Sequence, residues 1–439
     1  MISERFARKN TLFFLVQWLL VATVIAVLVG SASALFLFSL DWATATRIGH
    51  RWLIGLLPFA GFAVGWLYLR FGRSVEAGNN LILEEVHNPA NTIPLRMAPL
   101  VFIGTVVSHL FGASVGREGT AVQMGASIAD RFTPLLNLDN DARRMVLMAG
   151  VSAGFSSVFG TPLAGAIFGM EVMAIGRMHY TAIFPCLLAA VIADQVGLMW
   201  GVHHTHYAMS LIPPMSLWTL GAVIIAGGCF GLAARAFADA THLIGGIMKK
   251  YVAYAPLRPF IGGIMVALAV YLLHADRYIG LGIPTIVDAF QHPLAPWDFL
   301  GKLVFTVVSL GSGFKGGEVT PLFYVGATLG NALAPLLHLP FAFLAGLGFV
   351  AVFAGAANTP LASTLMAIEL FGADVGVYAA MACVMAYLVS GYTGIYRAQR
   401  VACLKHQVVP EGIALSELPA WQRKNAREHA RTEEAKADS

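Results

Sequence analysis

The sequence predicts an all-α protein that crosses a membrane many times. Of its 439 residues, 57% are hydrophobic and 12% are charged, about half of the roughly 25% charged residues usual in soluble domains. Mean hydropathy is +0.71. Long apolar runs recur along the whole chain, at 11–40, 52–69, 181–200, 217–234, 260–273 and 375–389. Together these observations indicate a polytopic membrane protein.

The remaining composition excludes several classes of function. The net charge is only +4, and no basic stripe with interleaved aromatic residues occurs, so nucleic acid is not an expected partner. The four cysteines are scattered without a CxxC pair, which indicates neither a metal site nor a disulfide framework. We therefore expect no cofactor. The first apolar run is too long for a signal peptide and lacks a cleavage pattern.

The charges at the two ends predict an orientation in the membrane. Arg5, Arg8 and Lys9 precede the first apolar run, so the positive-inside rule places residues 1–10 in the cytoplasm. Residues 11–404 form the expected membrane transport domain. The charged segment 405–439 is expected to be a solvated cytoplasmic tail, too short for a regulatory domain.

Glycine and proline interrupt the apolar sequence. The 45 glycines and 20 prolines divide it into pieces, many shorter than the roughly 20 residues of a full span. Broken helices at membrane depth are tolerated only where they line a cavity or are buried in protein. This pattern favours transport.

The two halves of the chain share landmarks in the same order. "TVVS" occurs at 105–108 and at 306–309, and "TPLA" occurs at 161–164 and at 359–362. The displacement of about 200 residues predicts an internal duplication, with repeats near 50–200 and 217–404. Such repeats in transporters enclose the substrate site near the midplane. The sequence leaves open whether the repeats are inverted or parallel.

Glutamates recur with the same landmarks. Glu118 follows the first "TVVS" and Glu318 follows the second, each two residues before a threonine. We therefore expect Glu318 to be the pseudo-symmetric partner of Glu118. Glu171 and Glu369 follow the two "TPLA" segments at equal spacing. We expect this second pair to support helix packing or salt bridges rather than to carry protons.

Three glycine-rich breaks are followed by helical sequence. They open at Gly78 in "EAGNNLILEE", at Gly116 in "GREGTAVQMG" and at Gly316 in "GGEVTPLFYVG". A helix N-terminus offers unpaired N–H groups and a positive dipole end, which together favour an anion. Three such ends at one point would bind a dehydrated anion without a full positive charge, which permits its release.

Glu118 acquires a role at such a site. An ionised carboxylate can occupy the anion site itself, and a protonated one can leave it, which couples a proton to anion movement. The alternative is a paired or interfacial carboxylate. Ionisable groups inside membranes are functional by default, so we assign Glu118 as a proton-carrying gate.

Several motifs resemble those of the CLC family of anion channels and proton-coupled anion exchangers. "GREGT" resembles the gating-glutamate motif, "GNNLI" and "GGEVTP" occupy the places of two anion-binding motifs, and "GIYRAQ" carries Tyr396 where the family has its pore tyrosine. The resemblance covers nearly the whole chain. It implies a homodimer with one pore per subunit. It also implies an inverted-repeat fold of many tilted and discontinuous helices.

The departures from the family motifs resemble a bacterial fluoride-exporting clade. Asn79 replaces the central serine, Thr120 replaces a proline, and Val319 with Thr320 stands where a phenylalanine is usual. Val172 occupies the place of the inner proton-accepting glutamate, so the usual proton route is absent. The resemblance implies a non-enzymatic antiporter in the bacterial inner membrane. It would export fluoride in exchange for protons and confer fluoride resistance.

The resemblance also implies the site residues. The anion path is expected to contain Gly78, Asn79, Gly119, Val319, Thr320 and Tyr396, with Arg117 and Thr120 in support. Amide and hydroxyl donors suit a small, hard anion. Glu318 is either a proton relay that replaces the missing inner glutamate or a structural carboxylate at its own helix start.

Other interpretations remain open or are set aside. A chloride/proton exchanger is one alternative, and a passive anion channel of the same family is another. The histidine cluster His203, His204 and His206 lies between apolar runs with no acidic or cysteine partner nearby in sequence, which argues against a metal site. No hydrolase or nucleotide-binding motif occurs.

Overall fold

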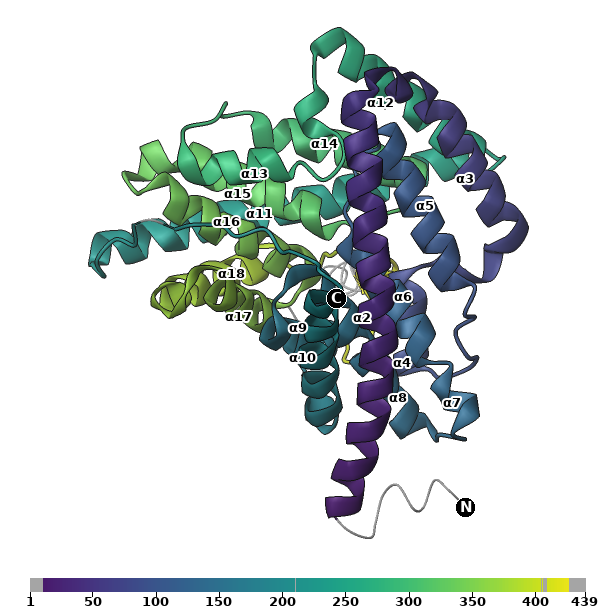
Figure 1. Cartoon of the computed structure of the whole chain (residues 1–439). Coiled ribbons are helices and arrows are strands. Elements are labelled where there is room, and N and C mark those ends of the chain that lie inside the picture. The colour runs from purple at the N-terminus through teal and green to yellow at the C-terminus, as the bar shows by residue number, and fades with distance from the viewer. Residues whose placement is uncertain (1–10, 210, 404, 406–408, 426–439) are drawn as a thin grey trace, which may run out of the picture.

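A computed structural model describes residues 11–209, 211–403, 405 and 409–425. Apart from one two-stranded sheet and short 3-10 turns, its elements are α-helices (Figure 1). The predicted N-terminal segment 1–10 and residues 426–439 lie outside the described part of the chain. Five described helical segments are long and apolar enough to cross a membrane, and further apolar helices of 10–17 residues accompany them.

The helices form two series that follow one another in the same order, with breaks at corresponding places. The first series is α2 (Thr11–Gly49), α3 (Leu57–Phe71), α4 (Asn79–His87), α5 (Met97–Phe111), α6 (Glu118–Ala129), α7 (Phe132–Leu135), α8 (Asn140–Phe159), α9 (Pro162–Glu171) and α10 (Ile183–Met199). The second is α11 (Leu217–Tyr251), α12 (Leu257–Leu273), α13 (Ile283–Gln291), α14 (Asp298–Ser312), α15 (Val319–Leu337), α16 (Phe341–Ala357), α17 (Pro360–Phe371) and α18 (Gly376–Val389). Each series opens on one long helix, and only the first contains an extra short helix, α7.

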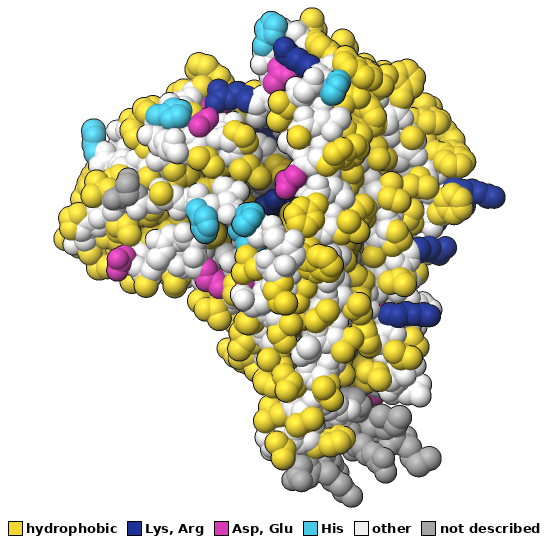
Figure 2. Space-filling model, viewed as in Figure 1, with side chains coloured by type: hydrophobic (Ala, Val, Ile, Leu, Met, Phe, Trp, Pro, Cys, Tyr) yellow, Lys and Arg dark blue, Asp and Glu magenta, His cyan; other side chains and the backbone are white. Residues whose placement is uncertain are grey.

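The two long helices exceed the apolar runs that predicted them. The run 11–40 becomes α2, which extends to Gly49, and the run 217–234 becomes α11, which extends to Tyr251. In Figure 1, α2 runs along most of the height of the molecule from the end marked N. Hydrophobic side chains cover most of the face in Figure 2, as expected for a surface in contact with lipid.

Close glycine crossings join the helices that carry the breaks. A Cβ on Gly125 of α6 would lie 2.2 Å from the carbonyl oxygen of Gly150 of α8. A Cβ on Gly326 of α15 would lie 2.0 Å from the carbonyl oxygen of Gly348 of α16. Small residues at membrane-helix crossings let the backbones approach closely. The same device therefore fixes α6 and α15, whose N-termini carry the candidate site.

Glu171 and Glu369 cap each other's helices. The Glu171 carboxylate, at the end of α9, accepts the N–H groups of Leu361 (3.0 Å) and Ala362 (2.8 Å) at the start of α17. The Glu369 carboxylate, near the end of α17, accepts the N–H groups of Leu163 and Ala164 at the start of α9, both at 2.8 Å. These bonds satisfy N–H groups that a helix start leaves unpaired. The packing role expected for both glutamates matches this arrangement.

A buried ion-pair network holds α4 against α8. Arg143 donates to Glu85 (3.0 Å) and to Asp130 (2.8 Å), and Asp130 also accepts the N–H of Ile93 (2.7 Å). All three charged side chains are buried. Because α4 begins at Asn79, the network fixes the direction of one helix that opens at the candidate site.

The segment after α18 packs on a small parallel sheet. Strand β1 (Ala174–Ile175) pairs with β2 (Arg400–Val401), and Ile175, Val401, Val409, Leu415 and Leu418 form a buried cluster. The start of the expected solvated tail is therefore packed against the membrane domain, because its apolar residues at 409–418 find this cluster. Residues 406–408 and 426–439 lie outside the described part.

The histidine cluster differs in one respect from expectation. His204 Nε2 lies 3.5 Å from Asp194 Oδ1 of α10, so an acidic group is close in space although it is ten residues distant in sequence. Within the described residues, no group of three or more histidine, cysteine, aspartate or glutamate side chains could hold a metal ion.

Candidate functional site

The three glycine-rich breaks meet at one place. Helix α4 begins after Gly78, α6 begins at Glu118, and α15 begins at Val319. Gly78 has a φ of +58°, a left-handed conformation that glycine adopts readily. A Cβ on Gly119 would lie 3.1 Å from Asn79 Nδ2 and 3.1 Å from the Cα of Gly317. The N-termini of all three helices therefore surround Gly119.

The two breaks pair through their backbones. Gly116 N–H donates to the Gly317 carbonyl (2.6 Å), and Gly317 N–H donates to the Gly116 carbonyl (2.8 Å), in an antiparallel bridge. This pairing fixes the register of the repeat. Arg117 follows Gly116 as the N-cap of α6, and Glu318 follows Gly317 as the N-cap of α15.

The structural partner of Glu318 is therefore Arg117, and the expected pairing with Glu118 is wrong. The structural partner of Glu118 is Val319. The two glutamates are 200 residues apart, whereas the backbone bridge pairs residues that are 201 apart, so the sequence comparison was off by one residue. The two "TVVS" segments are also 201 residues apart, in agreement with the bridge.

The Glu118 carboxylate occupies the N-terminus of α15. Its oxygens accept the backbone N–H of Thr320 (3.0 Å) and the Thr320 hydroxyl (2.6 and 2.7 Å). Arg117 adds its backbone N–H and its Nε, both at 3.3 Å. Glu118 is fully buried. The carboxylate thus takes the position that the N–H groups and dipole of α15 offer to an anion.

Glu318 also lies close to Gly119. A Cβ on Gly119 would lie 3.4 Å from Glu318 Oε2. This oxygen is buried and has no hydrogen-bond partner among the described residues. An unpaired buried carboxylate oxygen is costly, so Glu318 is not a carboxylate whose hydrogen bonds are all satisfied within the fold.

Asn79 and Tyr396 complete the surroundings. Asn79 is buried, and its Oδ1 lacks a partner within the described chain. The neighbouring Asn80 accepts the N–H of Ala398 (2.9 Å), which ties the segment that carries Tyr396 to the start of α4. Tyr396 is buried as well, and it lines the same cavity as Asn79.

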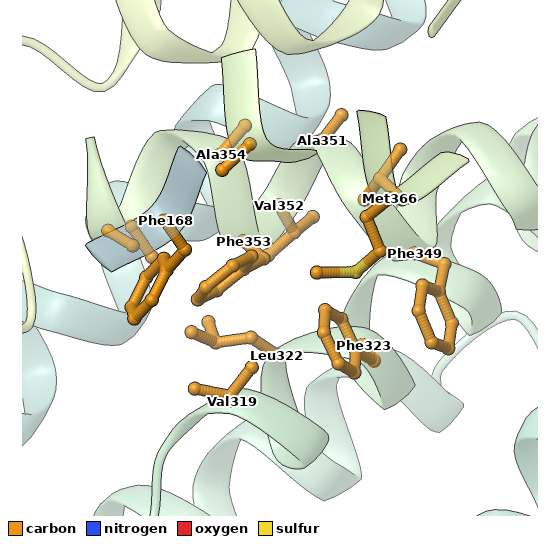
Figure 3. Close-up of a cluster of buried hydrophobic side chains, with 14 of the residues drawn as sticks. Phe168, Val319, Leu322, Phe323, Phe349, Ala351, Val352, Phe353, Ala354 and Met366 are labelled. Atoms are coloured by element: carbon orange, nitrogen blue, oxygen red, sulfur yellow. The ribbon is translucent and has the colours of Figure 1, made fainter. Parts of the chain in front are cut away.

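Val319 and Thr120 contribute less directly than Thr320. The Val319 side chain lies with Leu322 and Phe353 in a buried hydrophobic cluster (Figure 3), so only its backbone faces the site. The Thr120 hydroxyl is 2.8 Å from that of Thr105 on α5. Thr120 therefore fastens α6 to α5 and does not touch the Glu118 carboxylate.

The hydrophobic cluster closes one side of the site. Phe323 and Phe349 stack with ring centroids 4.0 Å apart, and Phe155 stacks on Phe168 at 4.3 Å. These rings belong to helices α8, α9, α15 and α16, and Figure 3 shows Phe168, Phe323 and Phe349 near Val319 and Leu322. Tight packing of this kind excludes water from that side.

A cavity of about 790 Å³ leads to the site from one face of the molecule. Its inner end is lined by Asn79, Glu318 and Tyr396, and its walls include Gln123 and Lys315. Our sequence analysis did not single out the last two. Lys315 could have been found, because a lysine between apolar segments, three residues before Glu318, is a rare intramembrane charge. Gln123 carries no comparable signal.

Comparisons with known proteins agree with this geometry. The family model described as "Voltage gated chloride channel" matches residues 60–391. The "Chloride/fluoride channel protein" of Pseudomonas syringae pv. tomato is 61% identical over 96% of this chain and 93% of its own length. The "H(+)/Cl(-) exchange transporter ClcA" of Vibrio vulnificus is 28% identical over 80% of this chain and 81% of its own.

Solved structures share the fold. The crystal structure of a CLC-type fluoride/proton antiporter has a TM-score of 0.86 at 35% identity, covering 90% of this chain and 100% of that one. A slow cyanobacterial Cl⁻/H⁺ antiporter has a TM-score of 0.75 at 22% identity, covering 85% and 94%. The chain belongs to the voltage-gated chloride channel (CLC) family and is an all-α, multi-pass membrane protein.

Proposed function

We propose that the protein is a proton-coupled fluoride antiporter that exports fluoride in exchange for protons. The observation that carries this proposal is the Glu118 carboxylate, which accepts the N–H and hydroxyl of Thr320 at the meeting point of three helix N-termini. Two relatives add support, one with fluoride in its name and one a solved fluoride/proton antiporter.

Competition for the same donors would couple the two ions. An ionised Glu118 holds the N–H and hydroxyl of Thr320, so an arriving anion must displace it. A protonated Glu118 is a poorer acceptor and yields the site. Each exchange of the carboxylate for an anion then favours uptake of a proton, and the return of the carboxylate favours its release.

The donors in the site suit fluoride. Fluoride is small and strongly hydrated, so it needs several strong donors to replace its water. The side-chain donors of Asn79, Thr320 and Tyr396 surround the site, with backbone N–H groups near Gly119 and Val319. Because Gly78 has no side chain, the start of α4 can approach the anion site closely. Field strength and donor number would determine the anion choice, as they do for cations in selectivity filters.

Glu318 is proposed as the second proton carrier. Its unpaired Oε2 lies near Gly119 and lines the cavity that reaches the site. It would carry the proton between the cavity and Glu118 in place of the inner glutamate, whose position is Val172. Full proton-coupled transport by Glu318→Gln would rule out this role.

The assembly and location belong to the same proposal. We place residues 1–10 and the tail from 405 in the cytoplasm and 11–404 in the bacterial inner membrane as one half of a homodimer. Charge supports this orientation. Arg70, Arg73, Lys249, Lys250 and Arg258 lie at the helix ends and loops that share the cytoplasmic side in this arrangement. The repeat boundaries start with α2 and α11 rather than near residue 50.

Flux from liposomes tests the function. Vesicles loaded with fluoride and an internal pH dye, with a fluoride electrode outside, should show fluoride efflux that drives protons inward. In Glu118→Gln, fluoride efflux should no longer drive proton movement, because the glutamine cannot carry a proton. Fluoride efflux without proton movement in the native protein would identify a channel. Equal coupled transport of chloride would identify a chloride/proton exchanger.

A further inference from the structure

We propose that the ammonium of Lys315 forms a loading subsite for a hydrated halide in the cavity, before the anion reaches Glu118 and Thr320. Lys315 lies in the turn between α14 and α15, three residues before Glu318, and it lines the cavity. This inference rests on the proposed anion transport. It adds a residue whose charge acts on loading rather than on exchange at the gate.

The stem of Lys315 is held, whereas its charged end is free. A Cβ on Gly104 of α5 would lie 3.0 Å from Lys315 Cβ and 3.1 Å from its Cγ, so the stem packs closely on α5. Nζ lies 4.1 Å from the centre of the Tyr68 ring. Within the described residues, this ammonium has no hydrogen bond or ion pair. The ring therefore orients a cation that keeps its hydrogen-bonding capacity.

A fully buried lysine of the fold, Lys302, provides a contrast. Lys302 of α14 donates to the carbonyl oxygens of Tyr278 (3.0 Å) and Gly280 (2.6 Å), so its protons are used within the fold. Lys302 thus has a structural role near the opposite end of α14. Lys315, which is partly buried, has no such acceptors, and an ammonium withdrawn from bulk water without an acceptor is costly unless water or an anion supplies one.

The charges around Lys315 favour an anion over a cation. The cavity walls carry Arg73, Lys249, Arg258, Lys315 and Arg397 against the carboxylates Glu76 and Glu318. The Nε groups of Arg73 and Arg258 donate to the backbone carbonyls of Leu69 and Val252, which fixes these side chains near the mouth. A positive excess between low-dielectric walls concentrates anions. Of this set, Lys315 is the cation nearest in sequence to Glu318 and to Thr320, which donates to the Glu118 carboxylate.

The chemistry of an ammonium suits a loading site. A lysine offers a compact, strongly hydrated charge, which attracts a halide without stripping its water. The helix N-termini beyond it then exchange that water for N–H and hydroxyl donors. Removing the charge should weaken capture without altering the exchange between anion and carboxylate at Glu118.

Charge and shape variants separate this role from others. Lys315→Met removes the charge and keeps the stem, Lys315→Gln is a polar neutral second variant, and Lys315→Arg keeps the charge. Lys250→Met is the matched control, because Lys250 lies in the last turn of α11 beside the cavity residue Lys249 but does not line the cavity itself. The readouts are the fluoride concentration at half-maximal efflux and the number of protons moved per fluoride.

We expect Lys315→Met and Lys315→Gln to raise the half-maximal fluoride concentration about tenfold, because one unit charge near the path has been lost. The maximal rate and the proton ratio should stay native, and added salt should slow these variants less than the native protein. Lys315→Arg and Lys250→Met should behave as native.

Two results would overturn the inference. An unchanged half-maximal concentration in both neutral variants, with native elution and melting, would show that Lys315 does not load the anion. A changed proton ratio would instead make it a proton relay. The proposed function fails separately, through absent proton coupling or a preference for chloride in the native protein. The concentration shift can then still be measured with whichever anion moves.

Discussion

At the scale of a single residue, the proposed exchange gives Thr320 two occupants to serve, the Glu118 carboxylate and the anion. Its backbone N–H and its hydroxyl both reach the Glu118 carboxylate. Any anion that replaces the carboxylate meets the same two donors. Under the proposed exchange, we therefore expect a hydroxyl at position 320 to contribute to the affinity of the anion and of the Glu118 carboxylate alike.

Thr320→Val should weaken fluoride binding and leave the fold intact. A hydrogen bond to a charged group contributes roughly 1.5–3 kcal/mol, so the half-maximal fluoride concentration should rise by about 10-fold or more. Thr320→Ser, which keeps the hydroxyl, should stay near native. Efflux measured with a fluoride electrode over a range of loaded fluoride would give both values.

Thr120→Val is the matched control for that measurement. The Thr120 hydroxyl bonds only to Thr105 among the described contacts, so its loss should lower the melting temperature slightly and spare the fluoride dependence. Equal shifts in Thr320→Val and Thr120→Val would show that the effect comes from disturbed packing at the starts of α15 and α6 and not from a lost donor.

Helices α9 and α17 are tied to each other by carboxylates at opposite ends. Glu171 accepts two N–H groups of α17, and Glu369 accepts two of α9. The arrangement is reciprocal because the helices are antiparallel and belong to equivalent places in the two series. It uses both carboxylates fully as acceptors, which argues for a role in stability.

Glu171→Ala should destabilise the protein without uncoupling transport. Two N–H groups at the start of α17 would lose their acceptor, at a cost of about 1–3 kcal/mol, and the apparent melting temperature in detergent should fall by a few degrees. Glu171→Gln, which keeps one acceptor oxygen, should fall less. A changed number of protons per fluoride in Glu171→Gln would contradict the structural assignment.

The glycine crossings make a second prediction at the scale of elements. Gly125→Ala and Gly326→Ala each place a methyl group within 2.2 Å of a backbone oxygen on the facing helix. The helices α6 and α15 must then move apart, at roughly 1–3 kcal/mol or more. Both variants should melt earlier and transport more slowly, since these helices carry Glu118 and Thr320.

Gly228→Ala provides the comparison, because a Cβ on this α11 glycine would meet no atom within 4 Å. It should melt and transport like the native protein. Native stability in Gly125→Ala would mean that the crossing adjusts without strain, and the close approach would then lose its proposed importance for the site.

At the scale of the whole molecule, the sequence predicted what depends on local pattern. Apolar runs became helices, and the breaks at Gly78, Gly116 and Gly316 became convergent helix starts, because glycine and helix-terminal chemistry act locally. The sequence did not predict the features that depend on tertiary contacts. The register of Glu318 depends on a backbone bridge between the two halves. The N–H groups at the start of α17 are accepted by Glu171, about 190 residues earlier in the chain. The apolar residues at 409–418 pack in a buried cluster that composition does not predict.

The orientation of the molecule gives the last prediction. Cys403 is exposed and lies beside Gly176, whose Cβ would be 2.7 Å from Cys403 Cβ. Gly176 precedes α10 in the chain, and His203 follows α10. The helical segment Tyr180–Met199 has 20 residues, about 30 Å at 1.5 Å per residue. Cys403 and His203 therefore lie on opposite sides of the membrane, with Cys403 on the side that we assign to the cytoplasm.

A membrane-impermeant maleimide tests this directly. It should label Cys403 in inverted vesicles and leave it unlabelled in intact cells. A Cys403→Ser, His203→Cys variant should show the reverse, and Cys403→Ser alone supplies the background from the partly exposed Cys229, since Cys186 and Cys383 are buried. Labelling of Cys403 from outside intact cells would invert the orientation. The cavity that contains Lys315 would then open to the exterior, and the charge there would act on the anion's exit.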